Sequence, residues 1–415
     1  MRKDKRVLFL GNLMIAYNRD VLRGVAKCAA NRPEIRVFFP DSFESADIPR
    51  LLQGDVHGVI AAGCPPAWRL PETIAKRRLP AVDISAELKP SSVPRVVTND
   101  AMVGRMAANY FIDRGFKRLV YYGLSQHYSS DVRQEGFCQQ ASKHGIIARC
   151  FQKENAEAED RAGIFPSTAA RWLKDLPKPT AIFAADDHLG AYLVEACQHL
   201  KIRIPEDVAL LGVDNDDLYG QLRTPHLSSI LQNTQEIGLR AMELLYRVMR
   251  GRKVRSSTVL IEPVRVITRL SSDIFGVEDE VVREALGLIQ QRLRNGLSVK
   301  WLADQLAISR PTLDRRFLAA LNRTPTMEIQ RTQMETARQL ILDSDMPIAQ
   351  VAEASGYSSP RQFSTSFHRY FKQTPRDMRK THRYAAPHSP DSRTEPSFLP
   401  NQKGYTTRYW DIHRH

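Results

Sequence analysis

The sequence predicts a two-lobed α/β region over residues 1–270, followed by an all-α region with two helix-turn-helix units over residues 281–383. The first observation behind this prediction is that short apolar runs alternate with longer amphipathic segments up to about Ile267, as strands and helices do in a doubly wound fold. The second is that the strand signals stop after Leu270, whereas helical spacing continues. A length of 415 residues also favours two to three domains over one compact core.

The apolar runs have the composition of buried strands. Each is short, rich in Val, Ile, Leu or Phe, and bounded by polar residues, Gly or Pro, which is typical of strands buried on both faces of a parallel sheet. The runs lie at residues 7–10, 37–39, 58–61, 81–84, 96–98, 119–122, 181–184, 208–213 and 259–261. Helical spacing occupies residues 20–30, 101–114, 131–144, 188–200 and 234–249. Because residues 118–123 echo residues 6–11, the run at Leu119 reads as the start of a second lobe, with a cleft between the two.

Composition excludes some classes of protein. Of the residues, 42% are hydrophobic and 26% charged, which indicates a soluble globular chain, and no apolar run is long enough for a spanning helix, so we expect no membrane contact. A secretion signal is an alternative reading of the basic start and the apolar residues 7–16, but Asn12 interrupts that stretch and no cleavage pattern follows it. Five cysteines without a CxxC pair fit neither a disulfide framework nor a zinc site, which favours the reducing cytoplasm.

The chain is basic, with 60 Lys plus Arg against 46 Asp plus Glu and a net charge of +14. Such an excess suits contact with a polyanion such as nucleic acid, although a merely basic surface would give the same total. The position of the charges must therefore decide between the two.

A helix, a short turn and a second helix are predicted over residues 299–317. The first helix places Leu302 and Ala303 on one face, and residues 307–309 make a tight break. Ser309 can cap the second helix, and Leu313 and Phe317 continue the buried face at a spacing of four.

The same device recurs over residues 348–367. Tyr357 and Ser358 match Ile308 and Ser309 at an offset of 49, and Gly356 supplies the permissive backbone that the turn needs. Residues 326–343 between the copies read as one long helix, which would hold the two units at the spacing of successive major grooves, about 34 Å. An ordinary helical bundle would explain the apolar stripes but not the duplicated turn.

The second copy, Gly-Tyr-Ser-Ser-Pro-Arg-Gln-Phe over residues 356–363 and onward to Pro375, resembles the signature of AraC-type DNA-binding domains, and the similarity covers about residues 281–380. The resemblance implies that the second helix of each unit enters the major groove of double-stranded DNA. The side chains then expected at bases or nearby phosphates are Arg310, Thr312, Asp314, Arg315, Arg361, Gln362, Ser364 and Thr365, with Lys372 and Arg376 as phosphate contacts.

The first 270 residues resemble the sugar-binding core of the lactose and galactose repressors, which shares the fold of periplasmic sugar-binding proteins. The matches include Val264–Arg269, read Val-Arg-Val-Ile-Thr-Arg, and Gly-Val-Asp-Asn at 212–215. Ligands of such sheets lie beyond the carboxyl ends of the strands. Polar residues that follow predicted strands, or that the family pattern supports, are Asn12, Tyr17, Asn99, Asp100, Arg133, Asp187 and Asp214. A surface salt bridge for Arg133 and a helix cap for Asp214 are the structural alternatives.

The two regions in this order are similar to the bacterial xylose operon regulators. That similarity implies a cytoplasmic homodimeric transcription regulator with a pentose effector, xylose first, and contact with RNA polymerase if it is an activator; it implies no catalytic residue, cofactor or metal. A carbohydrate-binding protein or enzyme with the same α/β build, or a regulator of a nucleobase, are the alternatives. No phosphate-binding, nucleophile-elbow or HExxH motif supports an enzyme. Residues 271–280 are expected to be a linker and 384–415 a flexible tail.

Overall fold

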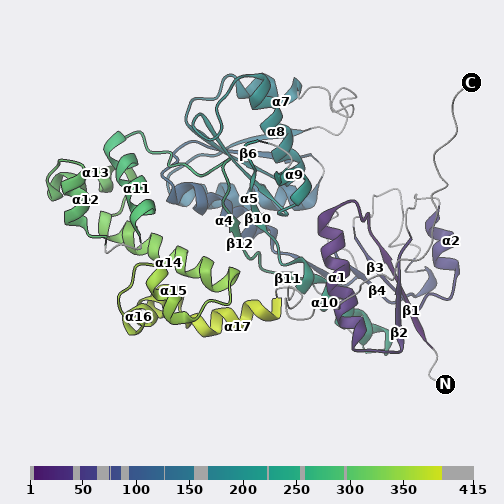
Figure 1. The fold of residues 1–415 in the computed structure, drawn as a ribbon. Coiled ribbons are helices and arrows are strands. Elements are labelled where there is room, and N and C mark those ends of the chain that lie inside the picture. Colours follow the sequence, from purple (N-terminus) through teal and green to yellow (C-terminus); the bar gives the residue numbers. More distant parts are fainter. Residues whose placement is uncertain are drawn as a thin grey trace, which may run out of the picture.

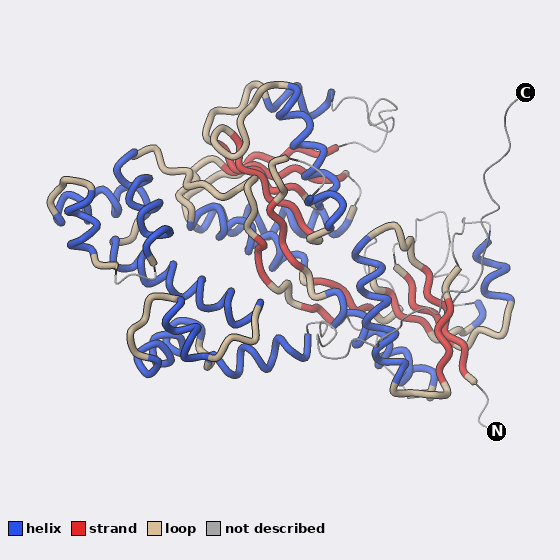
Figure 2. Tube along the Cα trace, in the orientation of Figure 1, coloured by secondary structure: helices blue, strands red, loops and turns tan. Residues whose placement is uncertain are grey.

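The computed structural model describes residues 4–40, 47–62, 74, 76–85, 93–125, 127–153, 167–221, 224–252, 258–293 and 297–385. Two α/β lobes lie side by side, and a helical region is packed under the second lobe (Figures 1 and 2). Of the expected flexible tail, residues 386–415 lie outside the described part. None of the helices in the described part combines the length and apolarity needed to cross a bilayer.

The first lobe is built on a parallel sheet with strand order β11-β5-β4-β3-β1-β2. Its strands are β1 (Lys5–Leu10), β2 (Ile35–Phe38), β3 (Gly58–Ala61), β4 (Ala81–Asp83), β5 (Arg95–Thr98) and β11 (Thr258–Ile261). Helices α1 (Ala16–Ala30) and α10 (Thr234–Met249) cover one face through a core that includes Val25 and Leu245, and α2 (Ile48–Gln53) packs on the other through Leu52.

The second lobe repeats this plan with strand order β12-β10-β9-β8-β6-β7, in which only β12 runs antiparallel among the pairs of the described strands. Its strands are β6 (Leu119–Leu124), β7 (Arg149–Lys153), β8 (Thr180–Ala184), β9 (Val208–Val213), β10 (Ser228–Leu231) and β12 (Arg265–Ile267). Its helices are α4 (Asp100–Asp113), α5 (Tyr128–Lys143), α7 (Ser167–Leu173), α8 (Asp187–His199) and α9 (Asp217–Gln221).

Every predicted apolar run lies within or overlaps a strand, and the predicted two-lobed α/β class is confirmed. The lobes are nevertheless interleaved along the chain. After β10, helix α10 and strand β11 return to the first lobe, and the chain then crosses back to form β12. The lobes are thus joined by three crossing segments, which follow β5, β10 and β11 and bring the carboxyl ends of both sheets toward each other.

Paired glycines let two helices in each lobe touch through their backbones. A Cβ on Gly104 of α4 would lie 2.1 Å from the carbonyl oxygen of Arg133, and one on Gly136 of α5 would lie 2.3 Å from that of Ala101. Gly24 of α1 and Gly238 of α10 meet the partner backbone in the same way. Each lobe therefore contains a helix pair that is packed too tightly to slide or separate without loss of stability.

We expect Gly104→Ala to destabilise the protein by about 1–3 kcal/mol, because α4 and α5 must move apart to admit the methyl group. Gly287→Ala is the matched control, since a Cβ at this position of the helical region meets nothing within 4 Å. That change should be neutral or stabilising by up to about 1 kcal/mol, through the higher helix propensity of Ala. Urea unfolding monitored by circular dichroism compares the two, and equal effects would contradict the close-contact explanation.

The helical region follows the second lobe and has two small cores. It consists of α11 (Glu280–Arg292), α12 (Val299–Gln305), α13 (Arg310–Leu321), α14 (Pro325–Asp343), α15 (Ile348–Ala354), α16 (Pro360–Phe371) and α17 (Pro375–Ala385). Phe317 is buried with Leu302 in the first core, and Phe367 is buried with Val351 in the second. The long helix α14 connects them, as predicted.

The two helix-turn-helix units have the same local construction, with one difference in register. Each turn contains a residue with left-handed backbone, Ala307 at φ 52° and Gly356 at φ 84°. The C-caps of the two second helices, Asn322 and Lys372, also have left-handed backbone and lie fifty positions apart in the sequence. Ser309 caps α13, but the cap of α16 is Ser359, not the matched Ser358. The second turn is therefore one residue longer than the first.

The segment expected to be a linker, 271–280, begins inside the second lobe. Ser271 and Ser272 are fully buried, the Ser271 hydroxyl donates to the Leu210 carbonyl at 2.7 Å, and the Ser272 hydroxyl lies 2.7 Å from that of Tyr110. The serines suggested a solvated connector. In the structure their hydroxyls instead make hydrogen bonds to polar groups that the buried turn would otherwise leave unsatisfied. The helical region is consequently fastened to the lobe from its first residues.

Candidate ligand cavity and helix-turn-helix surface

A cavity of about 210 Å³ lies where the carboxyl ends of the two sheets face each other. Drug-sized ligands need about 300–1,000 Å³, so this cavity suits a smaller molecule. Most of its lining residues have polar side chains: Ile15, Tyr17, Asn18, Ser85, Thr98, Asp100, Leu124, His127, Ser129, Ser130, Arg133, Ala185, Asp186, Asp214 and Gln232. Both lobes contribute to it, in agreement with the strand-end rule.

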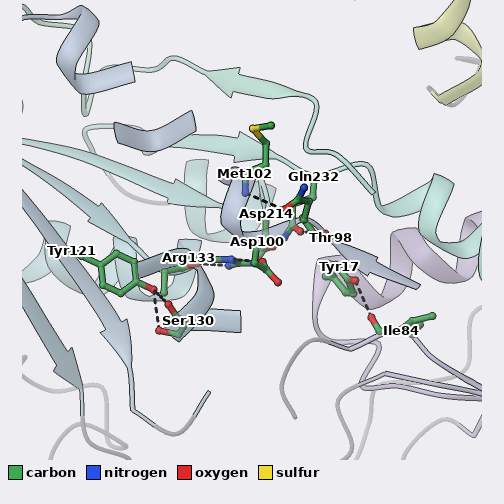
Figure 3. Close-up of polar contacts among 12 residues, drawn as sticks. Tyr17, Ile84, Thr98, Asp100, Met102, Tyr121, Ser130, Arg133, Asp214 and Gln232 are labelled. Carbon is green, nitrogen blue, oxygen red and sulfur yellow. Dashed lines mark hydrogen bonds and ion pairs between the residues drawn. The ribbon is translucent and has the colours of Figure 1, made fainter. Parts of the chain in front are cut away.

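Arg133 is the principal cation of the cavity. It lies on α5, is 9% exposed, and donates from Nε to Asp100 Oδ1 at 2.7 Å and from a terminal nitrogen to the Ala185 carbonyl (Figure 3). Burial lowers the pKa of Arg133, but the carboxylates of Asp100 and Asp214 outweigh it and the pKa is raised. The guanidinium thus stays charged, and its planar fork is held in place for a further acceptor.

A relay of side chains holds Asp214 opposite this cation. The Thr98 hydroxyl donates to the Gln232 side-chain carbonyl, and the Gln232 amide donates to Asp214 Oδ1. Asp214 has φ 105°, a left-handed backbone that places its carboxylate just past the end of β9. Burial raises the pKa of Asp214 to about 7, although Arg133 opposes the shift. The carboxylate is consequently poised to change its protonation state near neutral pH.

Tyr17 adds an aromatic ring from the first lobe. Its hydroxyl donates to the Ile84 carbonyl at 2.9 Å, which fixes the ring beside the cavity (Figure 3). Burial raises the pKa of Tyr17, so the phenol remains neutral. Across the cavity the Ser130 hydroxyl accepts from the Leu124 backbone N–H at 3.0 Å and lies 3.0 Å from the Tyr121 hydroxyl. The described part of the lining therefore offers the guanidinium of Arg133, carboxylates, an amide, hydroxyls and an aromatic face.

The structure brings Tyr17, Asp100, Arg133 and Asp214 together among the residues named from the sequence. Asn12, Asn99 and Asp187 lie outside the lining. The Asn12 side chain accepts from the Met14 N–H at 2.9 Å in an exposed turn. A strand-end position alone did not separate residues that stabilise the turn from residues that face the cavity.

Asn99 and Asp187 both serve helix starts. Asn99 caps α4 by accepting from the Met102 N–H at 3.2 Å, and its amide donates to Glu262. Asp187 is 1% exposed and accepts from the Asp216 N–H at 2.8 Å, and burial raises its pKa well above the ordinary value. Its predecessor Asp186, the cap of α8, lines the cavity instead.

Sequence reasoning missed several polar lining residues: Asn18, Ser85, Thr98, Ser130, Asp186 and Gln232. Asn18 could have been found from helical spacing, because it lies on the first turn of α1 beside Tyr17. Gln232 follows β10, a strand that the apolar pattern did not reveal because it begins with two buried serines.

The two second helices of the helix-turn-helix units present polar side chains to solvent. Arg310, Arg315, Arg361 and Gln362 are exposed, and so are Lys372 and Arg376 near the following helix. The other residues named from the sequence make bonds within their own helices. Thr312 pairs with the capping Ser309 at 2.8 Å, Asp314 lies 3.9 Å from Arg310, Ser364 donates to the Pro360 carbonyl and Thr365 to the Arg361 carbonyl.

Comparison with known proteins connects the two regions. A family model described as a periplasmic binding protein-like domain matches residues 108–272, and a helix-turn-helix domain model matches residues 302–381. The xylose operon regulatory protein of Haemophilus influenzae is 27% identical over 383 residues, 90% of this chain and 98% of that protein. The Escherichia coli protein of the same name is 27% identical over 385 residues, 91% and 97% of the two chains.

A solved structure agrees with these relatives. The structure of a xylose-binding transcription activator matches with a TM-score of 0.59 at 26% identity, and the match covers 92% of this chain and 99% of that one. The chain is therefore a homologue of the xylose operon regulators and has their organisation, a two-lobed periplasmic-binding-like domain followed by a helical helix-turn-helix region.

Proposed function

We propose that this homologue of the xylose operon regulators is a sugar-responsive, DNA-binding transcription regulator whose effector is a pentose, xylose first. The observation that carries the proposal is the cavity in which Arg133, Asp214 and the ring of Tyr17 converge from both lobes. The helix-turn-helix region and the similarity to xylose operon regulators over about nine tenths of the chain support the regulatory part.

The chemistry of the cavity suits a neutral polyol. Adjacent sugar hydroxyls need paired donors and acceptors, which a guanidinium and a carboxylate supply, and the C–H face of the ring packs on an aromatic side chain. Arg133 and Asp214 would take neighbouring hydroxyls, Gln232 would orient Asp214, and Tyr17 would cover the apolar face. The small volume favours a monosaccharide over an oligosaccharide.

The sugar would act by closing the lobes. A ligand that contacts both lobes binds the closed arrangement more tightly than the open one, and shifts the population accordingly. In the proposed mechanism, closure re-aims the helix-turn-helix regions of a homodimer on DNA in the cytoplasm, and the regulator activates transcription through contact with RNA polymerase. Its function requires no catalytic step, so we regard the chain as a regulator rather than an enzyme.

Thermal unfolding in a panel of ligands tests the effector class. A compound that binds only the native protein raises the midpoint, and at 100 times its dissociation constant it adds about 2.7 kcal/mol. We expect xylose to raise the midpoint more than arabinose, ribose or glucose does. If no pentose moves it while a nucleobase does, the effector assignment is wrong even though the regulatory function would stand.

For DNA recognition, we expect Arg315→Ala to weaken specific binding by about 1–3 kcal/mol, because an exposed Arg on α13 is placed to read guanine. Arg376→Ala should instead weaken binding to all sequences alike and lower the salt slope by about one, as a phosphate contact does. Fluorescence anisotropy with a site selected from a random pool and with an unrelated duplex separates the two effects. Uniform weakening by Arg315→Ala would remove that residue from base recognition.

A further inference from the structure

Helix α4 belongs to the second lobe but starts at the end of a strand of the first. Thr98 ends β5, and two residues later Asp100 opens α4 and pairs with Arg133 in the cavity at 2.7 Å. The body of the helix lies on α5 through Gly104, whose backbone touches that of Arg133. Any change in the angle between the lobes, or in the Asp100–Arg133 pair, therefore acts on the first turn of α4.

The other end of α4 contacts the helical region. The Asp113 carbonyl, in its last turn, accepts from the Arg323 guanidinium, and the Gly276 N–H donates to the Arg114 carbonyl at 2.9 Å. Gly115, at φ +82°, lies so close to Leu321 that a Cβ would approach it to 2.8 Å. Leu321 is the last residue of α13, the second helix of the first helix-turn-helix unit. With 14 residues, α4 spans on the order of 20 Å from the cavity to this contact.

A buried carboxylate holds Arg323 in this position. Glu328, in the first turn of α14, is fully buried and accepts from Arg323 and from Arg331, the latter at 2.7 and 3.1 Å. Arg323 and Arg331 are themselves only 13% and 17% exposed. A carboxylate enclosed by two guanidinium groups cannot readily release either, because each separation would leave a charge without compensation. Arg323 thus forms a stiff joint between α4 and the α13–α14 corner.

Beyond this joint, α4 and the helical region are held apart. A cavity of about 590 Å³ lies between them, and its lining includes Met106 and Tyr110 of α4, Gln290 of α11 and Gln339 of α14. Figure 1 shows α14 running below the second lobe, and Thr332, Glu335 and Gln339 of this helix line the cavity. Because the contact of α4 is concentrated at its carboxyl end, a movement of that end would turn the helical region about the joint.

We propose that Arg323 and Glu328 are positioning residues that transmit effector binding from Asp100, along α4, to the recognition helix α13. This inference rests on the proposed function, and it names the connection through which the sugar changes DNA affinity. The occupied cavity re-orients the first turn of α4; the Asp113 carbonyl and Gly115 move with the helix; and the Arg323–Glu328 joint carries that movement into α13.

The test is a coupling measurement on the full-length chain with D-xylose and a selected DNA site. The coupling factor is the ratio of DNA affinities with and without sugar, and by linkage it equals the ratio of sugar affinities with and without DNA. Factors of about 5–150 are usual. For Arg323→Met, which keeps the aliphatic stem and leaves Arg331 on Glu328, we expect a factor near one, with the sugar affinity of free protein unchanged within about twofold.

Two variants guard against a merely structural effect. Arg323→Lys keeps one cation for Glu328 or for the Asp113 carbonyl and should restore part of the coupling. Arg118→Met removes an exposed ion pair with Glu278 at the same boundary; within the described residues the hydrogen bonds of Arg118 go to Glu278 and the Pro179 carbonyl, not to α13 or α14, so the coupling should stay intact. A fully coupled Arg323→Met protein, or equal loss in Arg118→Met, would overturn the inference. If the wild-type chain bound no sugar or no DNA, the proposed function itself would fail.

Discussion

Arg133→Met should abolish the response to xylose. The guanidinium is the only Arg or Lys side chain among the described lining residues of the cavity, and in the proposed binding mode it would donate two charge-assisted hydrogen bonds to the sugar. Their loss would cost about 3 kcal/mol, on the order of 150-fold in dissociation constant. Thermal unfolding and calorimetric titration measure the loss directly. A xylose-induced shift in midpoint that survived the substitution would place the sugar elsewhere.

The control for this prediction concerns folding. Removing Arg133 leaves Asp100 buried without its partner, which by itself destabilises the lobe by about 3–5 kcal/mol. The double variant Arg133→Met with Asp100→Asn removes both charges of the pair and should recover most of that stability. It should remain unable to respond to xylose, because the donors to the sugar are still missing. Recovery of the response together with stability would reduce Arg133 to a structural role.

The fold was largely predictable because buried parallel strands appear in the sequence as apolar runs. Strands that depart from this pattern were missed for a physical reason. Ser228 and Ser229 of β10 are fully buried, but their hydroxyls bond the Arg269 carbonyl and the Asn215 N–H, so a polar sequence satisfies a core position. Strand β7 lies at the edge of the sheet, where it pairs with one strand instead of two, and it has charged residues at both ends. Local composition did not reveal either strand.

The sequence predicted which strand ends surround the site. It did not predict which of two neighbouring residues at a strand end faces the cavity. Asp186 and Asp187 are neighbours, yet Asp186 lines the cavity, whereas Asp187 is buried and accepts from the N–H of Asp216, just before α9. Asn99 and Asp100 divide in the same way, into a helix cap and a cavity carboxylate. The start of the following helix decides these outcomes, and helix starts are uncertain by a residue or more in a sequence. Family resemblance, not spacing, supported Arg133, because it lies inside a helix.

Asp214 gives the second large effect, a dependence on pH with opposite signs for binding and for stability. Its pKa of about 7 in the unliganded protein, against an ordinary 3.8, means that part of the population is protonated near neutrality. Only the ionised form accepts hydrogen bonds from two sugar hydroxyls. Xylose affinity should therefore fall about 25-fold between pH 7.5 and pH 5.5, following the ionised fraction.

Stability of the unliganded protein should change in the other direction. Because the folded-state pKa of Asp214 is raised, the folded protein holds this proton more tightly than the unfolded chain does, and stability is lost as pH rises from about 4 to about 7. Asp214→Asn lacks this term and tolerates the left-handed backbone at φ 105°, so it should gain about 1–3 kcal/mol over the wild type across that window. It should also bind xylose weakly, with no dependence on pH. If the Asn variant retained the wild-type pH profile, another group would be responsible for the titration. Loss of the profile in both binding and stability would show that the sugar binds only when the Asp214 carboxylate is ionised.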